Sequence, residues 1–366
     1  MITTVKLKIT ILSPVTIGSG AEWSPYADYV IDNERFYLLD RSKITQKVAE
    51  NDNWLEQYVN GIASKMNNNR SEFDLKLFLT GVLRENIDNM SVFHCPLASN
   101  NVNGKLPVKA LLRTPLYEAY IPGSSLKGAF KTVLIYDKLK DADIKSVLQY
   151  CALSDRNKRD IEINRWLKKQ EQQLEGQTQQ SKIIQQVTDS APIPKENSIV
   201  VDCWRNNMPL RFDCISEGAT SQFELTLSNY TWQKLAKDIN RFSYNTLTRE
   251  YNSLEDDDKN KNYRNELDRI LDLCDESPAN VACLRVGFGK GYFANSTGDA
   301  LFAYIENLED EQTKKRMEDI FQTYLQSIFK KGNQIIQDFD MYKFPRTHLR
   351  ISKQQKPLGW IKIEKV

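Results

Sequence analysis

The N-terminal stretch of the chain alternates between apolar and polar positions with a period of two. Residues 3–11 carry an apolar side chain at every second position, namely Val5, Leu7, Ile9 and Ile11. Because the side chains of a β-strand point alternately to opposite faces, this pattern predicts a half-buried strand. Two shorter strands are expected at 29–31 and 35–39, and the polar residues 32–34 between them predict a hairpin turn.

Longer segments follow a helical period instead. Helices are expected at about 43–50, 54–66, 71–85, 126–139 and 299–330, and a long helical region at 230–275 has an acidic break at 255–259. Further strands are expected at 198–204, 221–227 and 357–363. Strands and helices are therefore mixed along the whole chain.

The segment 120–130, YIPGSSLKGAF, joins an extended run to one of these helices. Pro122 and Gly123 predict a turn, because proline fixes φ and glycine tolerates a positive φ. Two serines and then two lysines one turn apart follow: Ser124, Ser125, Lys127 and Lys131. The serines are expected to cap the helix, and a capped helix start beside two lysines is a candidate phosphate seat. The alternative is a strand–turn–helix joint whose lysines are solvated.

The glycines of this segment have the spacing of a Walker A loop without its chemistry. Four residues separate Gly123 from Gly128, and the motif requires Lys and then Ser or Thr directly after the second glycine. Ala129 and Phe130 stand there instead. The lysine for the phosphates and the hydroxyl for magnesium are both missing, which argues against a nucleotide hydrolase.

A second glycine-rich segment, LRVGFGKGYF, spans residues 284–293. Glycine at alternate positions, Gly287, Gly289 and Gly291, lets backbone N–H groups approach a ligand closely. The spacing differs from that of a dinucleotide-binding loop. Basic and aromatic residues accompany the glycines: Arg285, Lys290, Tyr292 and Phe293. They favour nucleic acid, because bases stack on rings and cations meet phosphates; the alternative is a bend in a sheet.

The composition is that of an ordinary globular protein, with 366 residues of which 40% are hydrophobic and 27% charged. No apolar run approaches the roughly 18–20 residues that span a membrane, and the N-terminus lacks a signal-peptide core, which predicts a cytoplasmic protein. Six scattered cysteines are expected to be reduced core residues. The two histidines, His94 and His348, provide neither a metal site nor a catalytic pair, so neither a metal nor a cofactor is expected.

The net charge of +2 leaves any polyanion to local basic patches. The tail from Phe339 onward is the most basic part of the chain, with Arg346, His348 and Arg350 at its centre, and it is a candidate surface for an RNA backbone. Residues 141–190 are charged and rich in glutamine, which predicts surface helices with a flexible join outside the core. Acids interleave with the basic cluster at 156–169, so a solvated helix is preferred there over contact with a polyanion.

Five short blocks, taken in order, resemble the RAMP superfamily, the RNA-binding backbone proteins of CRISPR–Cas effector complexes. They are LSPVTIGSG at 12–20, YIPGSSLKGAF at 120–130, VTDS at 187–190, LRVGFGKG at 284–291, and FPRT at 344–347 followed by LGWI at 358–361. The order, spacing and chain length are similar to those of the subgroup that supplies the fifth subunit of type III-A (Csm) complexes.

The resemblance implies an α+β fold, with a ferredoxin-like (RRM-like) core that carries helical and thumb insertions. Residues 1–140 would form the first part of this core, with a helical insertion at about 43–90. Residues 141–195 would be a charged, glutamine-rich helical insertion and linker. Residues 196–366 would complete the core, with a helical insertion at about 230–280 and a basic C-terminal tail.

The resemblance also implies a non-catalytic subunit that caps the 3′ end of CRISPR RNA and assists RNA maturation in antiviral defence. Its expected partners are the 3′ region of CRISPR RNA and a neighbouring backbone subunit, with target RNA and host ribonucleases as further candidates and no membrane. The expected RNA-binding residues are Gly18, Ser19, Gly20, Ser124, Ser125, Lys127, Lys131, Arg285, Gly287, Gly289, Lys290, Arg346, His348 and Arg350. The alternative is a metal-independent endoribonuclease that processes repeat RNA with His94 or His348.

Overall fold

The alternating N-terminal residues form β1 (Ile2–Ile11), the middle strand of a five-stranded sheet. The strand order is β11-β13-β1-β10-β7, and each neighbouring pair is antiparallel. The other members are β7 (Ile184–Val187), β10 (Thr220–Ser228), β11 (Val281–Arg285) and β13 (Trp360–Lys365). The structure, a computed structural model, describes residues 1–67, 73–101, 105–175, 182–205, 208–293, 296–328, 339–343 and 349–366.

Two helices bury the apolar face of this sheet. α4 (Gly123–Lys138) and α7 (Trp232–Asn252) share one hydrophobic core with Leu7 and Ile9 of β1. Phe130 of α4 stacks beside Phe223 of β10, with 6.4 Å between ring centroids. α8 (Lys261–Asp275) packs on α7 and β11 after the acidic break. The half-buried N-terminal strand and the broken helical region at 230–275 are thus confirmed.

A second sheet contains the other eight strands of the described residues. Its order is β2-β6-β9-β8-β5-β4-β3, and β12 pairs with β8 outside this path. Its members are β2 (Gly18–Trp23), β3 (Tyr29–Asp32), β4 (Arg35–Leu39), β5 (Ser91–Ala98), β6 (Val108–Leu111), β8 (Ser198–Arg205), β9 (Met208–Ile215) and β12 (Arg350–Ile351). The predicted hairpin is confirmed, because β3 and β4 pair across a two-residue turn at Asn33 and Glu34.

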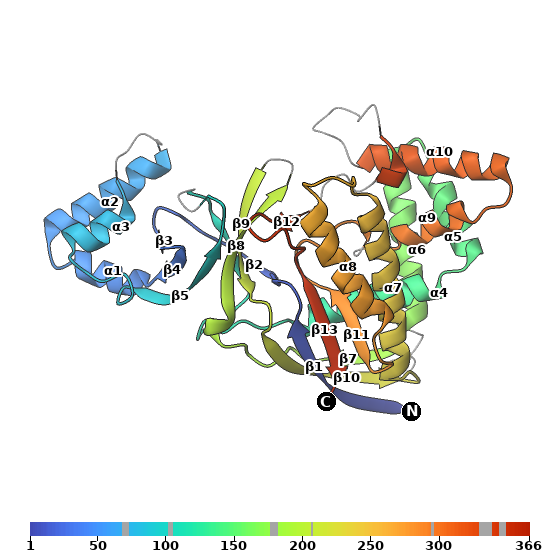
Figure 1. Cartoon of the computed structure of the whole chain (residues 1–366), viewed down its shortest axis with the longest axis horizontal. Helices are drawn as coiled ribbons and strands as arrows, with labels where there is room; N and C mark the ends of the chain where they lie inside the picture. The colour runs from blue at the N-terminus through green and yellow to red at the C-terminus, as the bar shows by residue number, and fades with distance from the viewer. Residues whose placement is uncertain are drawn as a thin grey trace.

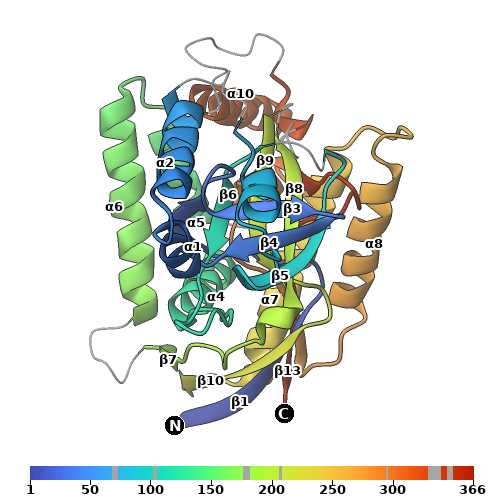
Figure 2. The same cartoon turned by 90° about the vertical axis from the view of Figure 1, so that its left-hand side faces the viewer.

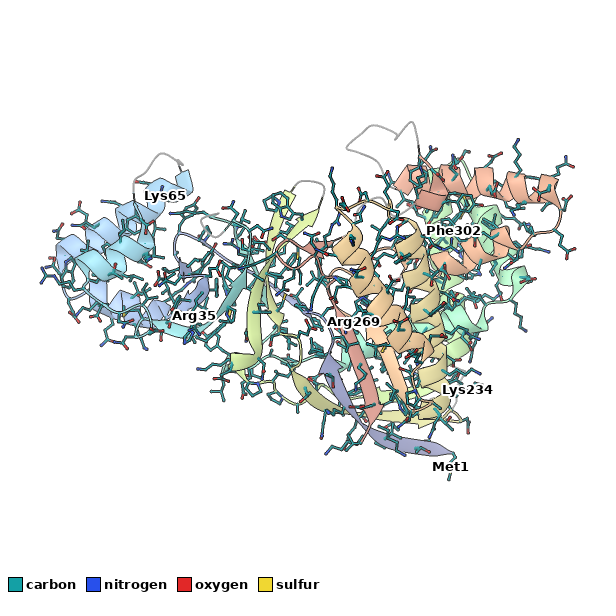
Figure 3. The ribbon with its side chains drawn as sticks, viewed as in Figure 1. Met1, Arg35, Lys65, Lys234, Arg269 and Phe302 are labelled. Carbon is teal, nitrogen blue, oxygen red and sulfur yellow. The ribbon has the colours of Figure 1, made fainter. Side chains whose placement is uncertain are left out.

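Helical lobes lie at the two ends of the molecule, with the sheets between them (Figure 1). The N-terminal lobe contains α1 (Arg41–Val48), α2 (Asp52–Asn67), α3 (Leu75–Leu77) and a π-helical turn at Phe78–Val82. Lys65 marks this lobe and Phe302 the opposite one in Figure 3. Both chain termini lie at one edge of the molecule, where β1 and β13 pair (Figures 1 and 2).

The opposite lobe has a hydrophobic core of its own. It is built from α5 (Asp141–Cys151), α6 (Arg156–Glu175), α9 (Gly298–Glu306) and α10 (Glu311–Ile328). Ile144 and Leu148 of α5 are buried there with Phe302 and Phe321. The prediction that residues 141–190 lie outside the core is therefore wrong for α5 and also for β7, a strand of the first sheet whose Ile184 is buried in the core. The glutamine run at 177–180 falls outside the described residues. No helix in the described ranges is long and apolar enough to cross a bilayer.

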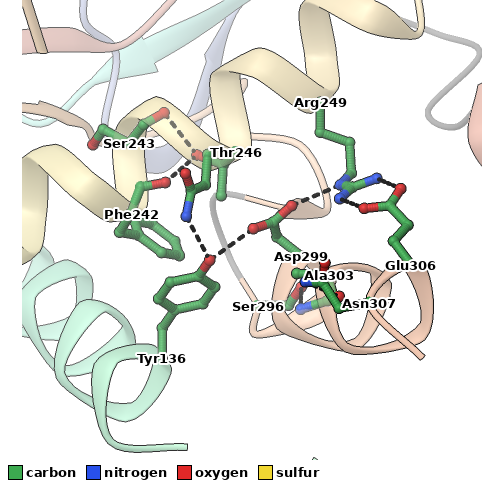
Figure 4. Close-up of polar contacts among 12 residues, drawn as sticks. Tyr136, Phe242, Ser243, Thr246, Arg249, Ser296, Asp299, Ala303, Glu306 and Asn307 are labelled. Atoms are coloured by element: carbon green, nitrogen blue, oxygen red, sulfur yellow. Dashed lines mark hydrogen bonds and ion pairs between the residues drawn. The ribbon is translucent and has the colours of Figure 1, made fainter. Parts of the chain in front are cut away.

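A polar network fastens this lobe to the helices of the first sheet (Figure 4). The Tyr136 hydroxyl of α4 donates to the Asp299 carboxylate at 2.8 Å, and Arg249 of α7 donates to the same carboxylate at 2.6 Å. The other two guanidinium nitrogens of Arg249 donate to the two carboxylate oxygens of Glu306 at 2.9 and 3.0 Å. Burial and the Asp299 charge raise the pKa of Tyr136, so the hydroxyl stays a donor.

Candidate nucleic-acid interface

The start of α4 is capped by a segment distant in the sequence. The N–H of Gly123 donates to the Asp189 carboxylate at 2.8 Å, and the N–H of Ile121 donates to the Ser190 hydroxyl at 3.0 Å. A Cβ on Gly123 would lie 2.3 Å from the carbonyl oxygen of Val187, so only glycine permits this approach. The blocks at 120–130 and 187–190 therefore form one unit.

The predicted serine caps are wrong. Pro122 occupies the N-cap position, and neither Ser124 nor Ser125 caps the helix. The carboxylate of Asp189 lies at the positive end of the helix dipole, where the phosphate seat was expected. Lys127 and Lys131 are half-buried and have interactions within the chain, among them a hydrogen bond from Lys127 to the Gln185 carbonyl at 3.3 Å. The solvated lysines of the alternative are not seen either.

The glycine-rich loop (residues 286–291) is packed between two other backbone segments. These are the first loop (residues 12–17) and the closing turn (residues 357–359). The N–H of Phe288 donates to the Thr16 carbonyl at 2.8 Å, and the N–H of Val286 donates to the Gly359 carbonyl at 2.7 Å. The N–H of Gly359 in turn donates to the Pro14 carbonyl at 2.9 Å. Three of the five sequence blocks thus meet at one place.

Gly287 is the tightest point of this contact. Its φ is +72°, and a Cβ there would lie 2.2 Å from the Thr16 carbonyl oxygen. Gly289 and Gly291 also have positive φ, at 95° and 70°, whereas Phe288 and Lys290 between them do not. The sign of φ thus alternates along residues 287–291, which is the pattern of the anion-binding backbone concavities called nests.

The nest leaves hydrogen-bond donors available. Among the described residues, no backbone carbonyl accepts from the N–H of Gly289 or Lys290. Lys290 is half-buried, and no salt bridge joins it to an acid in the described part of the chain. Burial and the nearby Arg285 charge lower the pKa of Lys290. An anion placed against the loop would restore the stabilisation that this ammonium has lost.

Arg285, at the end of β11, is buried instead of exposed. Only 3% of its surface is accessible, and its guanidinium donates to Glu250 at 2.8 Å and to the Leu358 carbonyl at 2.9 Å. The Tyr263 hydroxyl donates to the other oxygen of Glu250 at 2.6 Å. This position does not fit the expected phosphate contact, because every direction of the guanidinium faces protein.

The aromatic residues of the segment also differ from expectation. Phe293 is buried beside Phe302 in the core of the second lobe, with 5.4 Å between ring centroids. Tyr292 is half-buried and packs against the same core, and burial raises the pKa of its hydroxyl. Both rings are thus in contact with the second lobe instead of standing out from the loop. The exposed aromatic residue of the loop is Phe288, which is not among the predicted contacts.

Gly18, Ser19 and Gly20 begin β2, an edge strand of the second sheet. All three are exposed, and the Ser19 hydroxyl donates to the Ala110 carbonyl at 3.2 Å. The preceding residue, Ile17, would lie 3.1 Å from a Cβ on Gly287. The structure therefore brings the residue before Gly18 against Gly287, whereas a Cβ on Gly289 would meet Leu358 and Leu349 instead.

Acidic residues pair with several lysines of the basic tail. Lys353 pairs with Glu34 at 3.1 Å, and Lys356 pairs with Glu217 at 2.7 Å. Arg350 donates to the Asn260 side chain at 3.0 Å and stands 5.5 Å above the Tyr263 ring. Arg346 and His348 lie outside the described residues. Of the six cations that the structure describes in the tail, Arg350, Lys353, Lys356 and Lys362 thus have partners within the chain.

The remaining chemistry-bearing residues are dispersed. His94 lies 3.9 Å from Asp88 and 5.4 Å from the Tyr37 ring. Across the ranges that the structure describes, no three His, Cys, Asp or Glu residues gather to hold a metal ion. All six cysteines are buried and free of disulfides, which confirms their expected place in the core.

Comparison with known proteins identifies the family. The family model of the RAMP superfamily matches residues 8–294. The chain belongs to the RAMP superfamily. It is 25% identical over 254 residues to the CRISPR system protein Csm5 of Streptococcus thermophilus, and the matched region covers 65% of this chain and 68% of that relative. It is 31% identical over 159 residues to Csm5 of Methanocaldococcus jannaschii, which covers 42% of this chain but only 35% of that relative.

Solved structures share the RAMP fold of this chain along almost its whole length. A chain of a Csm–crRNA–target RNA ternary complex from a type III-A CRISPR–Cas system matches with a TM-score of 0.63 at 17% identity, covering 99% of this chain and 100% of that one. The crystal structure of Csm5 from T. onnurineus matches with a TM-score of 0.61 at 18% identity, covering 97% and 99%.

The contact at Gly287 leads to a first prediction. Gly287→Ala should lower the free energy of unfolding by about 3 kcal/mol or more, because it adds a backbone clash to the cost of a positive φ. Gly291→Ala is the matched control, since its φ is also positive but its Cβ meets open space, and it should cost about 1 kcal/mol. Urea denaturation measures both, and equal losses would contradict the close contact.

The cap of α4 leads to a second prediction. Asp189→Ala should lower the free energy of unfolding by about 1–2 kcal/mol, because the N–H of Gly123 loses its acceptor. Ser124→Ala and Ser125→Ala should each change it by less than about 0.5 kcal/mol. Thermal and urea unfolding of the three variants measure these changes. A serine variant that lowers the free energy of unfolding as much as Asp189→Ala would contradict the assignment of Asp189 as the cap of α4.

Proposed function

We propose that this chain is an RNA-binding subunit of a type III-A Csm effector complex. It holds the 3′ region of CRISPR RNA next to the last backbone subunit, assists maturation of that RNA in antiviral defence, and performs no catalytic step. The similarity to Csm5 proteins and to a chain of a Csm–crRNA–target RNA complex supports the assembly. The observation that carries RNA binding is the nest of the glycine-rich loop, which contains Lys290 and in which the N–H groups of Gly289 and Lys290 have no backbone acceptor among the described residues.

The topology supports a ferredoxin-like core within this fold. Along the chain, β1 leads through α4 to β7, and β10 leads through α7 toward the final strands. The neighbours β13-β1-β10-β7 have the antiparallel order of such a core, with β13 as the fourth strand. α8 turns the chain back after α7, so β11 pairs with β13 at the outer edge. The helical lobes and the second sheet are then insertions in this core.

The chemistry of the loop suits phosphates and not a particular sequence. Backbone N–H groups and an ammonium recognise charge and shape, and phosphates carry no base identity. A guide RNA differs in sequence from one spacer to the next, so its holder needs contacts of this kind. Target RNA and host ribonucleases are further candidate partners.

Binding of single-stranded RNA tests the proposal. The purified chain, alone and with its neighbouring Csm subunits, should bind a labelled RNA of mixed sequence at low salt with little dependence on sequence. The logarithm of the binding constant should fall with the logarithm of salt by about 0.7 for each phosphate contacted. Absence of binding in both forms at low salt would refute the proposal. Repeat-containing RNA should stay intact in EDTA, and specific cuts would instead favour the endoribonuclease alternative.

Lys290 provides a third prediction. Lys290→Ala should weaken RNA binding about fivefold to tenfold at low salt and reduce the salt slope by about 0.7, because one phosphate contact is lost. Lys353→Ala removes the same charge from a lysine that is paired with Glu34, so it serves as the control and should change neither quantity. Fluorescence anisotropy across a salt series measures both, and equal effects of the two variants would contradict the site.

Arg285 provides a fourth prediction, which separates a positioning role from a direct phosphate contact. The double variant Arg285→Met with Glu250→Gln avoids leaving one charge buried alone, which would cost about 3–5 kcal/mol. It should weaken RNA binding, because the loop loses its anchor, but leave the salt slope unchanged. A slope reduced by about 0.7 would show that the guanidinium itself meets a phosphate.

A further inference from the structure

Phe288 is an exposed aromatic residue on a backbone that cannot move freely. The side chain is 41% accessible, and its neighbours Gly287 and Gly289 both have positive φ. Its own N–H is held by the Thr16 carbonyl at 2.8 Å. The ring therefore leaves a fixed point of the glycine-rich loop and does not belong to a loose surface strand.

The ring is supported from one side and open on the other. Phe212 of β9 is fully buried, and its ring centroid lies 4.9 Å from that of Phe288 with 35° between the planes. Phe212 itself belongs to a core cluster with Cys203, Ile351 and Leu358. A tilted ring pair with one member fixed in the core is a rigid platform, and the protein leaves part of the outer surface of Phe288 uncovered.

A single exposed ring means little by itself, since isolated apolar side chains are common on protein surfaces. The position of Phe288 is more specific. Two residues further along the same loop is Lys290, which has no acid partner among the described residues and a pKa lowered by burial. The backbone N–H groups of Gly289 and Lys290, which directly follow Phe288, have no backbone acceptor among the described residues. An apolar partner would satisfy the ring but would leave this cation and these donors unpaired.

We propose that Phe288 stacks on one unstacked base of single-stranded RNA, while Lys290 and the N–H groups of the loop hold the phosphate of the same nucleotide. This inference rests on the RNA-binding function proposed above and adds a base contact to it. Stacking on a phenyl ring tolerates every base, because each has a π-face, so the contact strengthens binding without selecting a sequence. The subsite replaces the contacts expected of Tyr292 and Phe293, whose rings lie in the second lobe.

Three substitutions at Phe288 and one control test the subsite in the full-length protein. Phe288→Ala should weaken binding of a labelled mixed-sequence single-stranded RNA by about fivefold to a hundredfold, with an unchanged salt slope. Phe288→Leu keeps an apolar side chain without the π-face and should recover only part of the loss. Phe288→Trp should bind at least as well as the wild type. Tyr244→Ala removes a ring of similar exposure, 40%, from α7 and should have no effect.

The tryptophan variant also gives a spectroscopic signal. Its fluorescence change on titration with mixed-sequence RNA should exceed that with an RNA of abasic sites and with inorganic polyphosphate, because only bases stack on the indole. Equal changes with all three probes would overturn the base contact.

The outcomes separate this inference from the function on which it rests. If Phe288→Ala binds RNA as tightly as the wild type while Lys290→Ala binds more weakly, the stacking is refuted and RNA binding stands. If the wild-type chain, alone and with neighbouring subunits, does not bind RNA at low salt, the proposed function itself fails. If Phe288→Leu matches the wild type, the ring acts only as apolar surface and the stacking is refuted.

Discussion

The buried charge pair between Arg285 and Glu250 is the interaction on which the glycine-rich loop depends. Removing two opposite charges from water costs roughly several kcal/mol per ion, and this cost is offset only when the remaining donors and acceptors are also paired. Here the Tyr263 hydroxyl donates to the carboxylate, and the Leu358 carbonyl accepts from the guanidinium. Four elements, α7, α8, β11 and the closing turn, must therefore be in place together before the pair is tolerated. The loop that follows Arg285 directly acquires its fixed position from this requirement, and a fixed loop can present its N–H groups to a ligand without first being ordered.

Buried charges organise the second sheet in the same manner. Arg113 donates to both oxygens of the fully buried Asp213 and to the Ser198 hydroxyl, at 2.8, 2.6 and 2.9 Å. Burial raises the pKa of Asp213, and the Arg113 charge opposes that rise. Arg113 stands between β6 and the start of α4, so this pair ties the chain leading into α4 to β9. A buried pair with several obligatory partners permits few alternative arrangements, which is how it fixes the junction between the two sheets.

The elements that the sequence predicted well are those with one buried face. Each has a repeating pattern of apolar residues that is visible in the sequence, with a period of two in β1 and β10 and a helical period in α7 and α8.

The features that the sequence does not reveal depend on distant residues. The cap of α4 is one of them, because Asp189 is 66 positions from Gly123 and no local rule connects the two. The charge and glutamine content of 141–190 conceals the apolar residues of α5, Ile144, Val147, Leu148 and Cys151, which recur at helical spacing. Arg285 looked like a ligand contact because it adjoins three glycines, but its partner Glu250 lies 35 positions away. The sequence did contain a signal for Phe288, since an aromatic residue between two glycines in a tight loop has little opportunity to bury its ring.

The distribution of charge decides what kind of RNA site this chain can form. The net charge is +2, and two described tail lysines, Lys353 and Lys356, are paired with glutamates, so these lysines add little to a field that would attract a polyanion. Binding through many lysines would give a steep salt dependence, whereas a nest, one half-buried ammonium and one ring give a shallow one. Such a site depends on geometry instead of charge count, and its geometry is set by contacts as tight as that of Gly287 with Thr16. The proposed contact with RNA is therefore coupled to the packing of the first loop, β11 and the closing turn, and small backbone shifts there should affect binding more than the loss of a surface lysine.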